Sequence, residues 1–156
     1  MLEMQAFTSW GAQLRQMRAP DIELVLEIER QNFRDPWTRR AFLAEIEAKP
    51  ISQPLVVEYN GRIIGYVVPW FVVDELQIAN LAIHEDFRRR GLAKRLIAYL
   101  CEIAQQRNCT AAHLEVRHTN TAARQLYESL GFKTTAVRRA YYSPTEDALL
   151  MSKNLG

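Results

Sequence analysis

One short stretch decides the fold of this chain, because it places five cations around a glycine where an extended apolar run becomes helical: Asp86-Phe87-Arg88-Arg89-Arg90-Gly91-Leu92-Ala93-Lys94-Arg95-Leu96. Residues 75–83 before it are expected to form a strand, and from Ala93 onward the apolar residues recur at the spacing of a core-facing helix. The N-terminus of a helix carries unpaired N–H groups and a partial positive charge, so a glycine there favours close approach of a phosphate. The arginines and Lys94 would add mobile cations. The alternative is a solvated charge run, which the helix dipole disfavours.

Outward from this stretch, apolar spacing and turn signals predict helices and strands in mixed order. Asn60-Gly61 is the strongest short hairpin signal, because both residues tolerate positive φ. Thr38 and Asn120 are predicted to cap helices, and the first helix is expected to keep Glu29 on its polar side. The order predicts an α/β sheet with helices on both faces. Strands are predicted at 55–59, 62–68, 75–83, 111–117, 132–137 and 147–153, and helices at about 19–33, 38–49, 93–104 and 120–130.

The composition is typical of one soluble globular domain spanning residues 1–156, with residues 1–11 as an N-terminal extension. At 156 residues and 48% hydrophobic content the chain is long enough to bury a core. The 20 Lys plus Arg against 18 Asp plus Glu leave a net charge of +2, too small to steer the chain toward nucleic acid. No window approaches the roughly 20 apolar residues of a membrane span and no basic leader is present, so we expect no membrane partner and a cytoplasmic protein.

Cysteine and histidine are too scattered in the sequence to form a metal site. Cys101 and Cys109 make no CxxC pair, and the three histidines offer no ligand spacing. We therefore expect no metal and two reduced cysteines that serve packing. The histidines, His84, His113 and His118, are expected at surface or packing positions.

Four motifs occur in a fixed order, and together they are far more specific than the glycine loop alone. They are Leu81 to Ala93, which ends in the pattern Arg-x-x-Gly-x-Ala, then Leu114 to Asn120, Leu126 to Phe132, and Arg138 to Tyr142 with Glu146 to Ala148. In this order they resemble the GNAT superfamily of N-acetyltransferases, and within it the RimI-like branch that acetylates protein N-termini. The resemblance covers about residues 20 to 155. It implies a GNAT acyl-CoA N-acyltransferase fold: a mixed, mostly antiparallel sheet of about seven strands flanked by four helices.

The resemblance also implies a site for acetyl-CoA, with coenzyme A as the product. In the family, backbone amides of a pyrophosphate loop bind the diphosphate of the cofactor, and the preceding strand holds the pantetheine arm and the thioester. An asparagine in the position of Asn120 contacts the pantetheine arm, and Tyr127 is expected to touch the cofactor as well. The loop residues here are Arg88, Arg89, Arg90, Gly91, Leu92 and Ala93, and the strand residues are Leu81, Ala82 and Ile83.

The reacting groups and the substrate follow from the same resemblance. RimI-like enzymes use the glutamate of LEVR as general base, here Glu115, and the tyrosine of LYESLGF as general acid, here Tyr127. Their peptide groove involves the loop between the first two helices, here near Trp37, and the Tyr141-Tyr142 segment, which we expect in a loop over residues 140–146. Glu115 is expected to bind the substrate as well. The implied reaction is direct attack in a ternary complex by the α-amino group of a protein, with the N-terminal alanine of a small-subunit ribosomal protein as the favoured target, on a monomeric enzyme.

Elementary acid–base chemistry is consistent with these roles. An amine must be neutral to attack a thioester, and the leaving thiolate benefits from a proton. The reference pKa is about 7.7 to 8.0 for an α-amino group and about 10.4 for lysine, and one unit corresponds to about 1.36 kcal/mol. Neutralising the amine at pH 7 therefore costs roughly 1 kcal/mol for an N-terminus and about 4 to 5 kcal/mol for lysine. One carboxylate suffices to neutralise an α-amino group.

Other functions stay open on the sequence alone. A GNAT enzyme could act on a lysine side chain or a small-molecule amine, and a non-catalytic acetyl-CoA-binding module would need neither Glu115 nor Tyr127. Nucleic-acid binding through the arginines and their neighbouring tyrosines is the third possibility. Each site residue also has a structural alternative: a surface ion pair for Glu115, a core position for Tyr127, a helix cap for Asn120 and a staple at the helix junction for Trp37.

Overall fold

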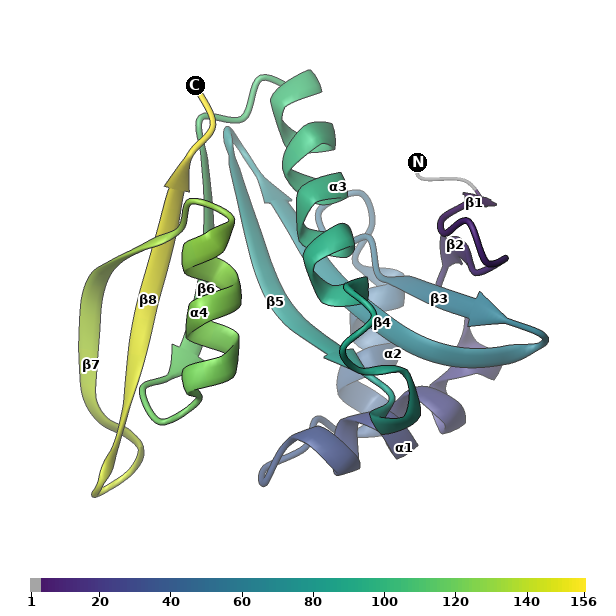
Figure 1. The fold of residues 1–156 in the computed structure, drawn as a ribbon, viewed down its shortest axis with the longest axis horizontal. Helices are drawn as coiled ribbons and strands as arrows, with labels where there is room; N and C mark the ends of the chain where they lie inside the picture. The colour runs from purple at the N-terminus through teal and green to yellow at the C-terminus, as the bar shows by residue number, and fades with distance from the viewer. Residues whose placement is uncertain (1–3) are drawn as a thin grey trace. The chain divides into compact units, whose positions relative to one another are not determined.

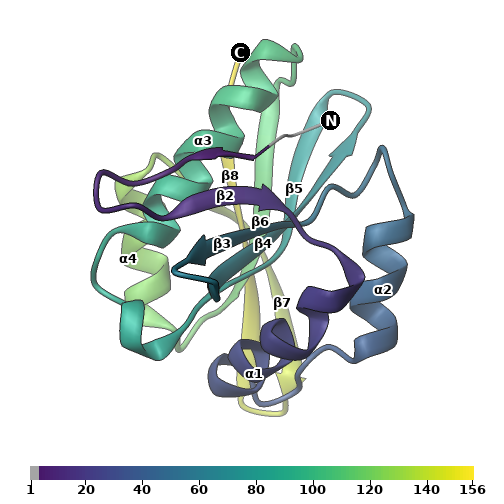
Figure 2. The same cartoon turned by 90° about the vertical axis from the view of Figure 1, so that its right-hand side faces the viewer.

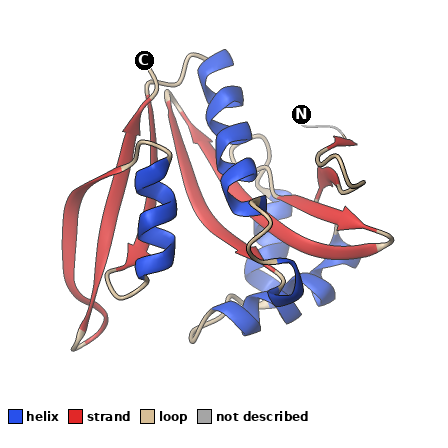
Figure 3. Ribbon diagram, viewed as in Figure 1, coloured by secondary structure: helices blue, strands red, loops and turns tan. Residues whose placement is uncertain are grey.

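The computed structural model describes residues 4–156, which divide into two compact units. The first unit comprises residues 4–70 together with Asn80–Ala93, and the second comprises Phe71–Ala79 together with Lys94–Gly156. Within the described residues, eight strands and four α-helices give a mixed α/β fold (Figure 3). Strand β5 (Glu75–Ile83) contributes its first half to the second unit and its second half to the first.

In the first unit, strands β1 to β5 are neighbours in chain order. They are β1 (Gln5–Ala6), β2 (Gln13–Gln16), β3 (Leu55–Tyr59), β4 (Arg62–Val72) and the end of β5. The pairs from β1 to β4 are antiparallel, with Leu14 of β2 opposite Val57 of β3, and Figure 2 shows β2 alongside β3. The unit also holds the 3-10 helix η1 (Ala19–Asp21) and the helices α1 (Ile22–Asn32) and α2 (Arg39–Glu47).

Local signals in this unit act as the sequence predicts. Asn60 and Gly61 both have positive φ, 50° and 76°, which confirms the predicted hairpin between β3 and β4. The Thr38 hydroxyl caps α2 by accepting the Ala41 N–H at 3.1 Å. Gly65 in β4 has a packing role, because a Cβ there would lie 2.8 Å from Ile83 Cδ1 and 3.3 Å from the Ala82 carbonyl. The glycine therefore lets β4 lie close against the end of β5.

The six strands predicted from residue patterns become eight because the segment before η1 contributes β1 and β2, close to the roughly seven that the family resemblance implies. Neither strand has a clear sequence signal, since β1 is two residues long and Leu14 and Arg15 in β2 are both buried. A buried arginine breaks the alternation of apolar and polar residues that predicts a half-buried strand. Gln5–Ala6 of the extension are thus part of the sheet.

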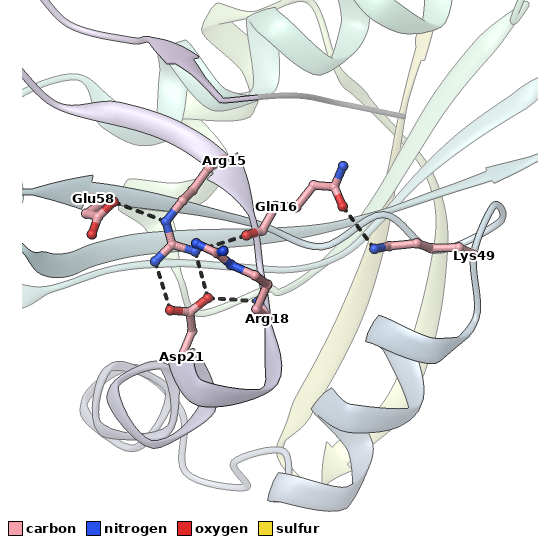
Figure 4. Close-up of polar contacts among 6 residues, drawn as sticks. All are labelled: Arg15, Gln16, Arg18, Asp21, Lys49 and Glu58. Atoms are coloured by element: carbon pink, nitrogen blue, oxygen red, sulfur yellow. Dashed lines mark hydrogen bonds and ion pairs between the residues drawn. The ribbon is translucent and has the colours of Figure 1, made fainter.

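Arg15 is accommodated in the interior by a network of carboxylates (Figure 4). It is 7% exposed, and its Nη1 and Nη2 donate to the two oxygens of Asp21, each at 2.8 Å, while Nε donates to Glu58 at 3.1 Å. The Arg18 N–H adds a further bond to Asp21 at 2.8 Å. Burial raises the pKa of Asp21, but the hydrogen bonds from Arg15 and Arg18 outweigh it and hold that pKa below its usual range. The network joins β2, β3 and η1.

In the second unit, the start of β5 and three later strands form the sheet. Strand β6 (Ala111–Arg117) pairs in parallel with β5, with Glu75 opposite Ala111, and β8 (Glu146–Asn154) lies antiparallel between β6 and β7 (Lys133–Ser143). Helix α4 (Thr121–Ser129) follows β6, as Figure 1 shows, and the Asn120 side chain caps it by accepting the Ala123 N–H at 3.2 Å.

Helix α3 (Leu92–Gln106) has the predicted apolar face. Its buried residues are Leu92, Leu96, Ile97, Leu100, Cys101 and Ala104. The spacing of these residues is that of one helical face, so the helix is held by tertiary packing. Within the described part of the chain, no helix is both long and apolar enough to cross a membrane.

The prediction of a loop over residues 140–146 is wrong. Strand β7 continues to Ser143 and β8 begins at Glu146, so that these two residues pair across a tight turn. Every residue from Lys133 to Tyr141 is exposed, so this edge strand lacks the apolar alternation that signals a strand. The backbone also leaves regular geometry at Ala140, whose φ is +51°.

We expect Asp21→Asn to lower the free energy of unfolding by about 3 kcal/mol at pH 7, because the buried Arg15 guanidinium loses its two-bond partner. The pKa of Asp21 is lower in the folded chain than in the unfolded chain. The stabilisation by Asp21 is therefore fully present above the unfolded pKa of about 3.9, and it is lost as the pH falls through the folded pKa. Urea unfolding at several pH values should therefore show that the free energies of unfolding of parent and variant converge in acid.

Glu23→Gln is the matched control, because Glu23 pairs with Arg39 at an exposed position and should contribute less than about 1 kcal/mol. Equal stability of the parent and Asp21→Asn at pH 7 would show that the network contributes nothing.

Candidate active site

The predicted pyrophosphate loop lies in the first unit, between the 3-10 helix η2 (Glu85–Phe87) and the start of α3 at Leu92. Arg89 and Gly91 both have left-handed backbone conformations, with φ of 64° and 75°. Among the described residues, no atom beyond the two adjoining residues lies within 4 Å of a Cβ placed on Gly91, so the glycine is required for its φ and not for space. Left-handed residues in a turn can aim successive N–H groups to one side, and a helix N-terminus adds further N–H groups. The loop has the backbone of an anion site.

Two arginines of this loop contact residues outside it. The Arg88 guanidinium donates to the Asn32 side chain at 3.0 Å. The Arg90 guanidinium lies over two aromatic rings, 4.8 Å from the Phe87 centroid and 5.4 Å from the Trp10 centroid. Asn32 and Trp10 are distant in the sequence, so no local pattern predicts these contacts.

The candidate cofactor strand is the end of β5. Ala82 and Ile83 are buried and Leu81 is half-buried. The Ile83 carbonyl accepts a hydrogen bond from Asn32 Nδ2 at 3.3 Å, and the next residue, His84, donates its N–H to the Ile64 carbonyl at 2.8 Å. These bonds join the strand to α1 and β4. Asn32 thereby contacts both the cofactor strand and Arg88 of the loop.

Glu29 is a residue that the sequence reading placed wrongly. It is 1% exposed, and its carboxylate accepts hydrogen bonds from Trp37 N–H at 2.8 Å, Asn80 Nδ2 at 2.8 Å and the Tyr66 hydroxyl. No cation pairs with it among residues 4–156. Burial, and then the charge of Glu29, raise the pKa of Tyr66, so this phenol stays a proton donor to the carboxylate. The buried residues Ile22, Val25, Leu26 and Glu29 have the spacing of one helical face, and this spacing is the sequence signal that indicates a buried Glu29.

Trp37, a candidate peptide-binding residue, is fixed at the connection between α1 and α2. Its N–H binds Glu29, and its half-buried ring lies 5.2 Å from the Phe42 ring of α2. The tryptophan therefore does serve the helix junction.

In the second unit, Glu115 on β6 belongs to a chain of charged and aromatic side chains. Its Oε1 is 3.5 Å from Arg138 Nη2, and Arg138 lies 5.2 Å from the Tyr141 ring centroid. Tyr141 and Tyr142 meet edge to face with centroids 5.1 Å apart, and Arg117 lies 4.0 Å from the Tyr142 centroid. The structure thus brings three predicted site residues of this unit, Glu115, Tyr141 and Tyr142, into one cluster. The predicted ion-pair alternative for Glu115 is also present.

Tyr127 lies on α4 with its ring centroid 6.3 Å from that of Phe132. Burial raises the pKa of Tyr127 to about 12, because the phenolate would be poorly solvated. Within the part of the chain that the structure describes, nothing hydrogen-bonds its hydroxyl. A protonated hydroxyl without a partner is available to donate a proton.

The cysteines and histidines have structural surroundings. Cys101 and Cys109 are buried and unpaired, and burial raises the pKa of both thiols. His113 Nδ1 lies 2.7 Å from Ser152 Oγ, and His118 Nδ1 accepts the Asp147 N–H at 2.9 Å. Within residues 4–156, no three His, Cys, Asp or Glu side chains are grouped as metal ligands.

Comparison with known proteins identifies the family. Residues 22–132 match the Acetyltransferase (GNAT) family. A Bacillus subtilis protein is 37% identical over 90% of this chain and 93% of its own length. This chain belongs to the GNAT acetyltransferase family. The prediction of a GNAT acetyltransferase, made from the four motifs, is confirmed.

Two solved structures show how this GNAT chain compares in three dimensions. The crystal structure of the ribosomal-protein-S18-alanine N-acetyltransferase of Escherichia coli has a TM-score of 0.85 and 28% identity, with 93% of this chain and 94% of that chain covered. A PaiA N-acetyltransferase of Thermoplasma acidophilum, solved in complex with coenzyme A, has a TM-score of 0.77 and 16% identity over 92% of this chain and 99% of its own. The second comparison shows the shared fold alone.

We expect Glu29→Gln to accelerate hydrogen exchange at the Trp37 amide by at least about tenfold, because hydrogen bonds to charged groups contribute about 1.5 to 3 kcal/mol. The glutamine amide has one acceptor oxygen where the carboxylate has two. In either orientation its NH2 group faces a donor, the Trp37 N–H or Asn80 Nδ2, and cannot accept that hydrogen bond. Amide exchange followed by NMR measures the effect directly.

Glu27→Gln, an exposed position on the same helix, should leave the Trp37 amide unchanged. The Ala123 amide, capped by Asn120, serves as the internal reference. An unchanged Trp37 rate in Glu29→Gln would mean that the carboxylate does not hold this connection in solution.

Proposed function

We propose that this GNAT enzyme transfers an acetyl group from acetyl-CoA to the N-terminal α-amino group of a protein, in one domain, by direct attack in a ternary complex. The observation that carries the proposal is Tyr127, whose half-buried ring, raised pKa and hydroxyl without a hydrogen-bond partner among the described residues suit a general acid. A binding module without turnover has no use for such a group. The relation to a ribosomal-protein-alanine N-acetyltransferase supports an N-terminal alanine of a ribosomal protein as the target.

Glu115 is the proposed general base. Its Oε1 lies 3.5 Å from Arg138 Nη2, and no hydrogen bond from the described residues reaches the carboxylate. The side chain is 32% exposed, so the carboxylate can accept a proton from the substrate amine, directly or through one water. The neighbouring Tyr141 and Tyr142, together with Trp37, are the proposed contacts for the peptide.

Tyr127 is the proposed general acid for the departing thiolate. With a pKa raised to about 12, its hydroxyl remains protonated throughout the neutral range. Donation of that proton gives coenzyme A as a thiol, which is a poorer nucleophile for the reverse reaction than the thiolate. Cys101 and Cys109 are buried thiols with raised pKa, so neither is suited to form a covalent acetyl-enzyme.

Acetyl-CoA would be held by the loop and by the end of β5. The N–H groups of the loop suit its diphosphate, and the strand Leu81 to Ile83 and Asn120 suit its pantetheine arm. When bound, the cofactor supplies the thioester carbonyl that the amine attacks. Both roles of Asn120 are compatible, because the cap uses only its Oδ1.

We further propose a cytoplasmic monomer without a nucleic-acid or membrane partner. Among the arginines near the two tyrosines, Arg117 pairs with Glu146 at 3.3 Å and Arg138 pairs with Glu115 at 3.5 Å. Such pairing removes the unbalanced positive charge on which nucleic-acid affinity depends.

An acetylation assay with a peptide panel tests the target. Peptides that begin with Ala or Ser should be acetylated far faster than peptides that begin with Met-Leu or Met-Glu, and faster than N-blocked peptides with an internal lysine. The α-amino group has a reference pKa about 2.5 units below that of lysine, which favours the neutral nucleophile by roughly 300-fold at pH 7. Mass spectrometry of the products identifies the acetylated amine.

The blocked versions are the control for lysine acetylation. Activity on blocked lysine peptides alone would assign the chain to lysine or small-amine acetylation, and binding of acetyl-CoA without any turnover would assign a binding module.

We expect Glu115→Gln to lower kcat at neutral pH by about 100-fold, the usual range for loss of a general base. The deficit should shrink as the pH rises above about 8, where the α-amino group is neutral without help. A pH profile of kcat that is parallel to that of the parent would remove Glu115 as the base.

Tyr127→Phe is the companion variant, because it deletes only the hydroxyl. Tyr127→Phe should lower kcat without changing the affinity for coenzyme A. This deficit should not shrink at high pH, because the pKa of about 12 keeps the phenol of the parent enzyme protonated there. Equal losses in turnover and cofactor affinity would instead assign Tyr127 to packing.

A further inference from the structure

The Trp10 side chain, in the segment before β2, contacts the pyrophosphate loop and the residue that precedes it. Trp10 lies in the turn between β1 and β2, its ring stacks on Phe87 with centroids 6.3 Å apart and planes 16° apart, and it meets Tyr59 edge to face at 4.9 Å. Phe87 is buried at the end of η2 and lies directly before Arg88, which opens the loop. The turn is thus packed on the residue from which the loop emerges.

Two guanidinium groups share this aromatic cluster, which we define as Trp10, Tyr59 and Phe87. Arg90 lies 4.8 Å from the Phe87 centroid and 5.4 Å from the Trp10 centroid, and Arg62 lies 5.5 Å from the Phe87 centroid. Within residues 4–156, neither arginine pairs with a carboxylate. Elsewhere in the first unit, Arg15 and Arg39 do have carboxylate partners. The cluster therefore carries two uncompensated positive charges beside the loop.

The aromatic faces fix a guanidinium that would otherwise be mobile. A stacked arginine at an exposed site gains about 0.5 to 1 kcal/mol, and its N–H groups remain free to donate in the plane of the group. A planar guanidinium with free N–H groups matches phosphate oxygens in a two-bond geometry. Arg90 is held in this way one residue before Gly91, the residue whose left-handed φ shapes the loop.

We propose that Trp10 is a positioning residue for the cofactor: it holds Arg90 as a fixed cation that binds a phosphate group of coenzyme A. The inference rests on the proposed acetyl-CoA site and adds the N-terminal segment to it. The ligand chemistry is a phosphate of the cofactor, which is either the diphosphate or the 3′-phosphate of the ribose. Arg62, on the same ring, adds to the local positive potential.

Binding of coenzyme A and of 3′-dephospho-coenzyme A, measured by calorimetry on the full-length protein, tests the proposal. Trp10→Ala should weaken coenzyme A binding about threefold to fivefold, the range that corresponds to the loss of one exposed cation–π contact. Trp10→Phe, which keeps an aromatic face, should restore most of the affinity. In an Arg90→Gln background, Trp10→Ala should cause no further loss, because the cation that it positions is already absent.

Two controls separate this effect from general damage. Arg107→Gln removes a guanidinium that is stacked on Phe71 at 4.3 Å just beyond the far end of α3, and it should not change the affinity. Melting temperatures identify a variant that has lost its fold, and Trp10→Phe keeps the test valid if Trp10→Ala unfolds.

Each outcome decides the matter. A loss for coenzyme A alone assigns Arg90 to the 3′-phosphate, an equal loss for both ligands assigns it to the diphosphate, and both results support the proposal. Unchanged affinity in Trp10→Ala, or equal losses with and without Arg90, overturns it while the acetyl-CoA site stands. Failure of the parent protein to bind coenzyme A would instead overturn the proposed cofactor itself.

Discussion

The buried carboxylate of Glu29 is the constraint on which the geometry of the first unit depends. A carboxylate without a cation in the interior needs several well-placed donors, since its desolvation is otherwise very costly. Here the donors come from β4, β5 and the connection between α1 and α2: Tyr66, Asn80 and the Trp37 N–H. Because Asn80 directly precedes Leu81 to Ile83, the end of β5 proposed to hold the pantetheine arm, one group fixes both that strand and the connection that carries Trp37.

The parts of the fold that the sequence predicts well are those set by neighbouring residues. Strands β5 and β6 have the predicted bounds, because each combines extended apolar patterning with clear breaks at both ends. The Asn60-Gly61 turn and the caps at Thr38 and Asn120 are local hydrogen-bonding or dihedral effects, and all three are present. The candidate site was predicted through motif order, which fixes residue identity but gives no side-chain geometry.

The parts that the sequence does not predict depend on partners distant in the chain. Arg15 is buried because Asp21 and Glu58 lie beside it, and Glu29 is buried because three donors reach it. A single sequence treats both residues as surface charges. The second half of strand β7, residues 138–143, is missed for the opposite reason: its mostly exposed residues carry no pattern, and only pairing with β8 defines it. Arg90 likewise depends on Trp10, which is 80 residues away in the sequence.

Charge compensation explains how an arginine-rich cluster can lie beside Glu115, the proposed base, which would have to receive a cationic amine. Arg138 occupies one oxygen of Glu115, and Arg117 is balanced by Glu146, so the cluster near Tyr141 and Tyr142 has little net charge. The Glu115–Arg138 contact is long, at 3.5 Å, and both side chains are partly exposed, so it is a weak ion pair. In the proposed reaction, an incoming ammonium group would replace Arg138 at little cost, since one cation exchanges for another. Arg138 would then keep its place over the Tyr141 ring and hold the tyrosine pair.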